Sequence, residues 1–248
     1  MAASMPFDRV ADRYDETRGG EERGRRTADD LVPWLMPGSV LEIGVGTGLV
    51  ALPLLERGYV VAGVDLSPAM LARARARIGQ RVARADALAL PIASGSVDNV
   101  VFVAALHAIG DTPGALAEGA RVLRRGGRLL AAHGVPFRVH NDMEAATAGL
   151  AALREARFDT PDAVGVAAAA AGLRPVADRL TAAWNKPGES PNEAANGIEQ
   201  RLWSFLWDID DATWDSVVAP TVERLRSLPD PDRPRPDTGR MRLAVFER

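Results

Sequence analysis

The sequence predicts an α/β fold of the doubly wound class, in which helices cover both faces of a mostly parallel sheet. Short apolar runs alternate with segments of helical periodicity between residues 39 and 133, and this alternation is typical of strand–helix–strand units. The runs are continuously apolar, as strands are when both faces of a sheet are buried. A glycine-rich loop joins the first run to the following helix. The 248 residues suffice for one large domain with a small elaboration.

The composition excludes several classes of protein. The chain has no cysteine, which rules out disulfides and thiolate chemistry. The formal net charge of −3 lacks the basic field expected of a protein that binds polyanions. No run reaches the roughly 20 apolar residues that span a bilayer, and residues 1–16 contain no apolar signal segment. We therefore expect a cytoplasmic protein without membrane insertion or a nucleic-acid partner.

The amino-terminal half supplies a cap and the first five strands. Phe7, Val10 and Tyr14 have the spacing of a short amphipathic helix, and a second helix ends near Met36. Strands are predicted at 39–43, 59–64, 81–84, 97–104 and 128–133, and helices at 49–57, 68–78 and 112–123. The helix at 68–78 begins with Ser67-Pro68, which is a capping residue followed by proline at the first helical position.

The carboxy-terminal half predicts two further strands and a helical insertion. Helices are predicted at 142–157, 161–171, 192–209 and 212–228, and strands at 174–183 and 241–246. A stretch rich in Pro, Asp and Arg at 229–236 predicts an extended linker. We expect a single domain over 1–248 with seven strands in all. Its parts are an N-terminal helical cap at 1–36, a cofactor-binding core at 39–186, a helical insertion at 187–237 and a last strand at 238–248.

The glycine loop is the strongest functional signal. Gly44, Gly46 and Gly48 follow the first strand and precede a helix. Glycines let the backbone turn sharply and approach a ligand, and the helix that follows offers unpaired N–H groups. The dinucleotide fingerprint would place its third glycine where Leu49 stands, which argues against NAD or FAD. The alternative is a tight strand–helix turn that binds nothing.

Two carboxylates follow neighbouring strands. Asp65 ends the second strand, where an acidic side chain can accept hydrogen bonds from both hydroxyls of a ribose. Asp86 follows the third strand and is suited to accept from an exocyclic amine. For each residue taken alone, a solvated loop carboxylate is the alternative.

In combination, these elements resemble a known family. The segments V-L-E-I-G-V-G-T-G, V-V-A-G-V-D-L-S-P-A-M-L, A-D-A-L-A-L-P and A-L-A-E-G-A-R-V-L-R-R-G-G occur in the order and spacing of class I S-adenosylmethionine-dependent methyltransferases. The resemblance covers residues 40–131 and is to the subgroup that includes quinone C-methyltransferases and many natural-product methyltransferases. It implies a Rossmann-like methyltransferase fold, S-adenosylmethionine as cofactor and S-adenosylhomocysteine as product.

The resemblance also implies which residues contact the cofactor. The glycine loop would pass the methionine part, Asp65 would bind the ribose, and Asp86 would accept from the adenine amine. The N-terminal Tyr14-Asp15 would close over the site, with Arg18 near the cofactor carboxylate. The full set is Tyr14, Arg18, Glu42, Gly44, Gly46, Gly48, Asp65, Leu66, Met70, Asp86, Ala87 and Val103.

Family chemistry implies an in-line displacement, in which the protein aligns the reactants, excludes water and removes a proton where needed. His107 follows the fourth strand and is the candidate general base or substrate contact, because its ordinary pKa suits neutral pH. For His107 the alternative to a catalytic role is simple packing. For His133 and His140 a packing role is favoured more strongly than for His107. A metal site of histidine with Asp111 or Asp142 is not supported by any diagnostic spacing, so we expect none.

The segment 190–228 carries two apolar stripes. Ile198, Leu202, Phe205 and Ile209 form one, and Trp203, Trp207 and Trp214 form its neighbour. We expect a lid over the substrate or a dimer surface, with an ordinary core helix as the alternative. The acidic residues at 189–215 disfavour an anionic substrate approaching there.

The function expected is methyl transfer to an oxygen, nitrogen or carbon nucleophile of a small apolar or aromatic metabolite, by a monomer or homodimer. A non-catalytic domain that binds the cofactor or its product, as a regulator or scaffold, is the alternative. Amino-directed nucleic-acid methyltransferases often carry Asn/Asp-Pro-Pro-aromatic after the fourth strand, and this chain has Val103-Ala-Ala-Leu-His107 instead.

Overall fold

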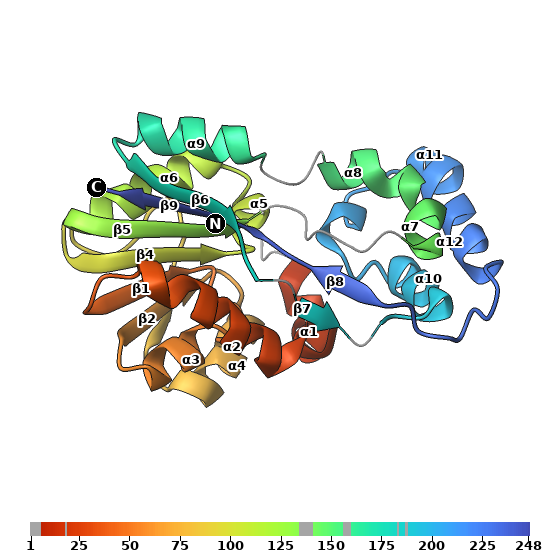
Figure 1. Cartoon of the computed structure of the whole chain (residues 1–248), viewed down its shortest axis with the longest axis horizontal. Coiled ribbons are helices and arrows are strands. Elements are labelled where there is room, and N and C mark those ends of the chain that lie inside the picture. The colour runs from red at the N-terminus through yellow and green to blue at the C-terminus, as the bar shows by residue number, and fades with distance from the viewer. Residues whose placement is uncertain (1–5, 18, 134–140, 156–159, 183, 187) are drawn as a thin grey trace. The chain divides into compact units, whose positions relative to one another are not determined.

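A computed structural model describes residues 6–17, 19–133, 141–155, 160–182, 184–186 and 188–248. The chain divides into two compact units (Figure 1). The sheet unit comprises Met1–Gly134, Asp159–Ala182 and Met241–Arg248, and the helical unit comprises Val135–Phe158 and Ala183–Arg240. The insertion expected at 187–237 lies within the helical unit, which also takes in residues 135–158.

The sheet unit is built on the seven-stranded sheet that the sequence predicts. Its strands are β1 (Ser39–Ile43), β2 (Val60–Asp65), β3 (Val82–Arg84), β4 (Val97–Val103), β5 (Leu123–His133), β6 (Arg174–Leu180) and β9 (Arg242–Glu247). Their order across the sheet is β3-β2-β1-β4-β5-β9-β6. The first five pair in parallel, and β9 pairs antiparallel with both β5 and β6. The doubly wound fold class is therefore confirmed.

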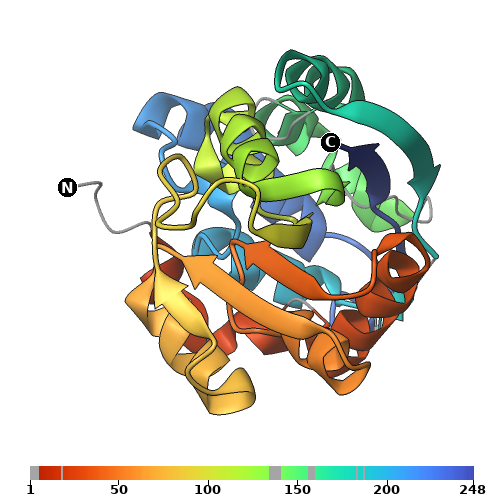
Figure 2. The same ribbon diagram turned by 90° about the vertical axis from the view of Figure 1, so that its left-hand side faces the viewer.

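Helices cover both faces of this sheet. One face carries α2 (Gly20–Leu31), α3 (Ala51–Glu56) and α4 (Pro68–Ile78), and the other carries α5 (Leu106–Ile109), α6 (Thr112–Val122) and α9 (Pro161–Ala170). In Figure 2 the teal helix α9 lies above the sheet and the golden helix α4 below it. Burial on both faces explains why the central strands are mostly apolar, with Glu42 of β1 and Asn99 of β4 as buried polar exceptions.

Capping residues set where the main helices begin. The side chains of Ser67, Asp111 and Thr160 accept hydrogen bonds from the third residue of α4, α6 and α9, respectively. Each helix also has proline in its first turn, where no N–H partner is needed. For this reason the predicted starts at 68, 112 and 161 are confirmed.

The strand β5 begins earlier than predicted. Its pairing with β4 starts at Leu123 opposite Val97, and the register then shifts so that Arg128 lies opposite Asn99. The stretch between the predicted helix at 112–123 and the predicted strand at 128–133 is thus a bulge within β5, in which Gly126 has a positive φ of 76°.

Two long helices predicted in the helical unit are broken. The stretch 142–157 forms α7 (Asp142–Ala146), a 3₁₀ turn (Ala148–Leu150) and α8 (Ala151–Glu155). The stretch 192–209 forms α10 (Pro191–Glu199) and then a 3₁₀ turn (Ser204–Leu206). The helix α10 ends in a Schellman motif: the N–H of Leu202 bonds the carbonyl of Gly197, and Arg201 takes a positive φ of 50°.

The other elements of the helical unit surround a core of their own. A run of α11 (Asp211–Thr213), a π turn (Trp214–Val218) and α12 (Ala219–Arg226) matches the helix predicted at 212–228. Trp203 and Trp214 pack against this core, as expected of an ordinary core helix, and the lid role stays a prediction. The segment 229–236 is turned rather than extended, because Arg235 pairs with Asp142 and donates to nearby carbonyls. Two short strands that were not predicted, β7 (Trp184–Lys186) and β8 (Asp237–Gly239), pair antiparallel.

None of the helices within the described ranges is both long enough and apolar enough to cross a membrane.

The centre of the sheet unit offers a test of its packing. Phe102 on β4 is 1% exposed and belongs to the core between the sheet and α6 and α9. We expect Phe102→Ala to lower the free energy of unfolding by about 3–5 kcal/mol, because the lost ring leaves a cavity. Urea denaturation measures this change. Val60→Ala, at a side chain that is 71% exposed, is the control and should change the same quantity by less than about 1 kcal/mol.

Candidate functional site

The main pocket lies at the carboxyl ends of the parallel strands, where β1 and β4 part. The chain runs from β1 outward through β2 to β3 and then returns to β4 on the other side of β1. Ligands of doubly wound folds bind at this switch point. The pocket holds about 240 Å³ and receives residues from the ends of β1, β2, β3 and β4. A smaller pocket of about 50 Å³ shares Tyr14, Gly44, Gly46, Val103 and Ala104 with it. The two are therefore neighbours along one surface.

The glycine loop lines both pockets through Gly44 and Gly46. The N–H groups of Gly44 and Val45 both bond the carbonyl of Val64, which turns the chain sharply after β1. Gly46 has a positive φ of 55°, and a Cβ built on it would meet no atom within 4 Å. Its backbone therefore faces open space and can be approached closely by a ligand. Gly48 does not line either pocket and packs against Ala74 of α4 instead.

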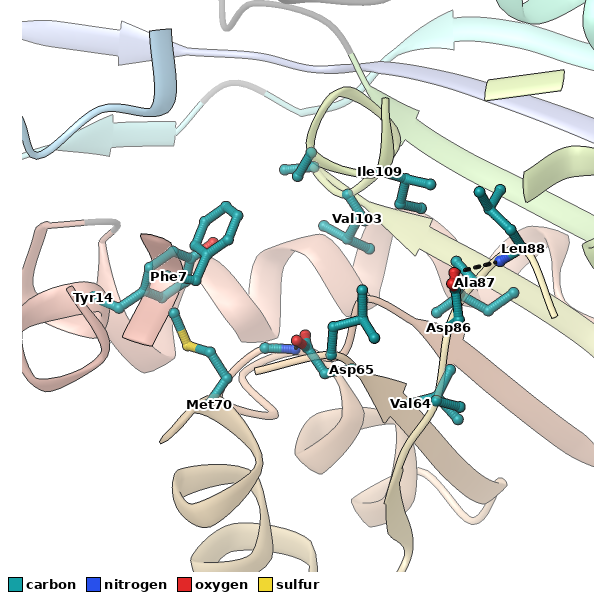
Figure 3. Close-up of a pocket in the computed structure, with 18 residues that line it drawn as sticks. Phe7, Tyr14, Val64, Asp65, Met70, Asp86, Ala87, Leu88, Val103 and Ile109 are labelled. Atoms are coloured by element: carbon teal, nitrogen blue, oxygen red, sulfur yellow. Dashed lines mark hydrogen bonds between the residues drawn. The ribbon is translucent and has the colours of Figure 1, made fainter. Parts of the chain in front are cut away.

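Asp65 organises the loop from the end of β2. One carboxylate oxygen accepts from the N–H of Gly46 at 2.8 Å, and the other accepts from the N–H of Ser67 at 2.9 Å. Burial raises the pKa of Asp65, while the bonds from Ser67 and Gly46 oppose that rise. Since a carboxylate has about four acceptor positions, each oxygen keeps a position for a ligand. Asp65 lines the main pocket, between Phe7 and Tyr14 at one end and Asp86, Ala87 and Leu88 at the other (Figure 3).

Glu42 carries a buried carboxyl group on the smaller pocket. It is 2% exposed, and its Oε2 has no hydrogen-bond partner among the described residues. Burial, and next the nearby charge of Asp65, raise the pKa of Glu42 from 4.5 to about 8. A buried acceptor without a partner is costly in a folded protein. The position is therefore suited to a ligand that brings a positive charge or a donor.

Arg23 lines the same small pocket as Glu42. It reaches the site because α2 crosses close to the start of α3, where a Cβ at Gly24 would lie 2.2 Å from the carbonyl oxygen of Leu49. The small pocket thus offers a guanidinium and a carboxyl group together, with the hydroxyl-bearing Thr27 and Thr47 beside them. This pairing is complementary to a ligand that carries both charges, such as an α-amino acid group.

The N-terminal segment forms one wall of the site. Tyr14 lines both pockets and Phe7 lines the larger. The two rings meet edge to face, with centroids 6.4 Å apart, an arrangement favoured between aromatic rings. The η1 turn (Pro6–Arg9) and α1 (Ala11–Thr17) carry these residues.

Most residues predicted to hold the cofactor are brought together. Leu66, Met70, Asp86, Ala87 and Val103 line the main pocket alongside Asp65 and Tyr14. Oδ1 of Asp86 accepts from the N–H of Leu88 at 2.9 Å, as the dashed line in Figure 3 shows. Asp86 is half-buried.

None of the described histidines is among the residues that line the two pockets. His107 lies on α5, of which Ala108 and Ile109 line the main pocket, but His107 itself is not among the lining residues. His133 is buried at the end of β5, at 3% exposure. Arg18 and His140 lie outside the described residues. Within the described ranges, no group of three or more acidic or histidine side chains is arranged to hold a metal ion.

Sequence reasoning missed several lining residues. They are Phe7, Arg23, Gly24, Thr27, Ile43, Val45, Thr47, Leu49, Val50, Val64, Ala85, Leu88, Ala104, Ala105, Ala108 and Ile109. Phe7 shows the amphipathic spacing that predicts a helix, but no sequence signal assigns it to a ligand. The helix α5 has four residues, too few for periodicity to reveal.

The pKa of Glu42 predicts a pH dependence of stability. Between pH 4.5 and about 8 the folded chain holds a proton on Glu42 that the unfolded chain releases. The stability linked to this group is therefore complete below pH 4.5 and is lost as the pH rises toward 8. We expect the unfolding free energy of the wild type, minus that of Glu42→Gln, to fall by up to about 1.4 kcal/mol per pH unit in this range. Urea denaturation over a pH series measures the difference, and a flat difference would show that Glu42 titrates normally.

Comparison with known proteins agrees with the fold and the loop. A family model described as "Methyltransferase domain" matches residues 41–131. The demethylmenaquinone methyltransferase of Thermus thermophilus is 40% identical over 136 residues, which cover 50% of this chain and 62% of that protein. The ubiquinone/menaquinone biosynthesis C-methyltransferase of Paracoccus denitrificans is 38% identical over 140 residues, covering 50% and 55%. These matches thus extend over less than two thirds of either relative's length.

A solved structure shows the same fold across most of the chain. It is phosphoethanolamine N-methyltransferase 2 of Haemonchus contortus, in complex with phosphomonomethylethanolamine and S-adenosylhomocysteine. The TM-score is 0.55 and the identity 23%, over 93% of this chain and 53% of that one.

The glycine loop, Glu42, Asp65 and Asp86 all lie inside the range 41–131 that the family model matches. Residues 41–131 thus match a methyltransferase domain model, and the chain shares the fold of this solved structure.

Proposed function

We propose that this chain transfers a methyl group from S-adenosylmethionine to a nucleophilic atom of a small molecule. The observation that carries the proposal is the buried Glu42 carboxyl, whose Oε2 lacks a partner among the described residues and lies beside the glycine loop. Asp65 stands at the end of the adjacent strand, so two acceptors flank the loop. The matched methyltransferase domain supports the same conclusion.

The main pocket fits the adenosine part of this cofactor. Asp65 keeps acceptor positions for the two ribose hydroxyls after bonding the backbone of Gly46 and Ser67. Leu66 and Met70 supply apolar contacts for a flat ring, and Asp86 offers a carboxylate oxygen to an exocyclic amine. The backbone N–H of Ala87, the residue after Asp86, is a donor that the same ring could use.

The smaller pocket fits the methionine part. Glu42 would accept from the ammonium group and face the positive charge of the sulfonium, and Arg23 would bind the carboxylate. Arg23 is therefore proposed for the role that the resemblance gives to Arg18. When bound, the cofactor supplies a methyl group on a positively charged sulfur that a nucleophile displaces in line.

The acceptor side of the pocket is apolar. Val103, Ala104, Ala108 and Ile109 line it, with Phe7 from the N-terminal segment. Such a surface favours an apolar or aromatic metabolite. Oxygen, nitrogen and carbon acceptors all fall within the proposal, since the relatives named above include both a C-methyltransferase and an N-methyltransferase. The protein's part is to align the acceptor and exclude water.

The proposed setting follows from composition. A net charge of −3 and the absence of cysteine favour a cytoplasmic enzyme that acts on a small molecule rather than on nucleic acid. We propose a monomer or homodimer, and sedimentation of the purified chain distinguishes the two.

The cofactor is tested by thermal unfolding. A ligand that binds only the folded state at 100 times its Kd adds about 2.7 kcal/mol of stability. We expect S-adenosylmethionine and S-adenosylhomocysteine each to raise the Tm of the wild type, and Asp65→Ala to lose most of that increase. Asp162→Ala, an exposed carboxylate on α9, is the matched control and should keep it. If neither ligand raises the Tm of folded, ligand-free wild type, the proposal is wrong.

The prediction from the sequence that His107 acts as a general base is tested separately. A general base typically contributes about 10²–10⁴-fold to the rate. Because His107 does not line the pocket, we expect His107→Gln to leave the Kd for S-adenosylhomocysteine unchanged, and a fall in kcat of about 100-fold or more would support the general-base role. Transfer of labelled methyl groups to an acceptor extracted from cells provides the rate. An unchanged kcat would assign His107 to packing of α5.

A further inference from the structure

The N-terminal segment is tied to the glycine loop through one acidic residue. The carboxylate of Asp15 accepts from the hydroxyl of Thr47 at 2.6 Å and from Nη2 of Arg77 at 2.6 Å. Arg77 also donates from Nη1 to the backbone carbonyl of Thr47 at 2.8 Å. The three residues form a closed network that joins α1, the glycine loop and α4.

This network is shielded from solvent. Thr47 is 1% exposed, and the side chains of Asp15 and Arg77 are 16% and 21% exposed. A second ion pair on the same two helices, between Asp12 and Arg73 at 2.9 Å, has an Asp12 side chain that is 96% exposed. Exposed pairs of this kind contribute little to stability, whereas shielded pairs with additional hydrogen bonds contribute more. Of these two ion pairs, that of Asp15 therefore contributes more to the attachment of α1. The preceding η1 turn is attached separately, because the carboxylate of Asp8 accepts from the hydroxyl of Ser67 and from the N–H of Ala69.

The residue next to Asp15 closes the site. Tyr14 lines both pockets and contacts Phe7, and these two are the described lining residues of the main pocket that precede β1. All other described residues of that lining come from the ends of strands β1 to β4 and the segments that follow them. The N-terminal segment is thus a separate wall on an otherwise fixed pocket.

The chain beyond α1 is suited to a hinge. Gly19, which caps the start of α2, and Gly20, the first residue of α2, both have positive φ, at 85° and 56°. Glycine takes such angles without strain and changes between them at low cost. The helix α2 is in turn fixed by the close approach of Gly24 to Leu49.

We propose that the Asp15–Arg77–Thr47 network is a latch that holds the N-terminal wall shut over the cofactor and sets the rate of cofactor release. The inference rests on the proposed function for the identity of the cofactor. Asp15 and Arg77 are positioning residues, since they act through Tyr14 and the loop and touch neither pocket. Opening the latch frees the segment that carries Phe7 and Tyr14 and exposes the pocket.

The test compares Asp15→Asn, Arg77→Gln and the double variant with Arg73→Gln as the matched control one turn away on α4. Dissociation of radiolabelled S-adenosylhomocysteine is followed after a chase with unlabelled ligand. We expect each single latch variant to release the ligand about tenfold faster, and the double variant no faster than the singles, because residues in one network are coupled. Arg77→Lys keeps the charge but not the fork of donors. Its rate of ligand release should lie between the rates of the wild type and of Arg77→Gln. Arg73→Gln should release the ligand at the same rate as the wild type.

Trypsin provides a readout that does not need the cofactor. Cleavage after Arg13 in the ligand-free protein, identified by mass spectrometry, should be faster in Arg77→Gln than in Arg73→Gln. The proposal is overturned if Arg77→Gln changes neither ligand release nor this cleavage, or if Arg73→Gln changes both equally. If the wild type binds no S-adenosylhomocysteine, the proposed function fails, and the cleavage rates alone decide whether the latch exists.

Discussion

The carboxylate of Asp65 is the interaction on which the site depends. It holds two backbone N–H groups, one from Gly46 in the glycine loop and one from Ser67 at the start of α4. Ser67 in turn caps α4 through the N–H of Met70. One side chain at the end of β2 thus fixes the loop after β1 and the helix after β2 in a single arrangement. The cavity between them is preformed because these three segments cannot move independently.

This arrangement has an electrostatic cost that a ligand would relieve. Glu42 and Asp65 stand at the ends of adjacent parallel strands, and the charge of Asp65 disfavours ionisation of Glu42. Burial is the larger contribution to the raised pKa. Two buried acids at one loop destabilise the empty protein relative to an apolar pair of the same size. Strain of this kind is typical of functional sites, where a ligand rather than the protein completes the set of partners.

The sheet and its order of elements could be predicted because local signals agree with the tertiary structure. Ser67-Pro68 and Asp111 followed by Pro113 favour helix starts through local interactions alone, and buried parallel strands favour apolar runs. The site carboxylates Asp65 and Asp86 could be placed because strand ends meet at one edge. The end of α10 could not be predicted, because Arg201 rather than glycine takes the left-handed position, and the close packing of Trp203 on Gly197 accompanies that turn. Arg23 was missed for the same kind of reason, since it depends on how closely α2 crosses α3 at Gly24.

The position of β9 has a consequence for synthesis of the chain. This strand follows β6 in the sequence, yet it lies between β5 and β6 and supplies hydrogen bonds to both. Until Arg242–Glu247 leaves the ribosome, β5 has an open edge and β6 has no neighbour in the sheet. Open edges of this kind pair readily with other chains. Completion of the sheet therefore depends on residues 242–247, and a chain shortened before Arg242 would lose β6 along with β9.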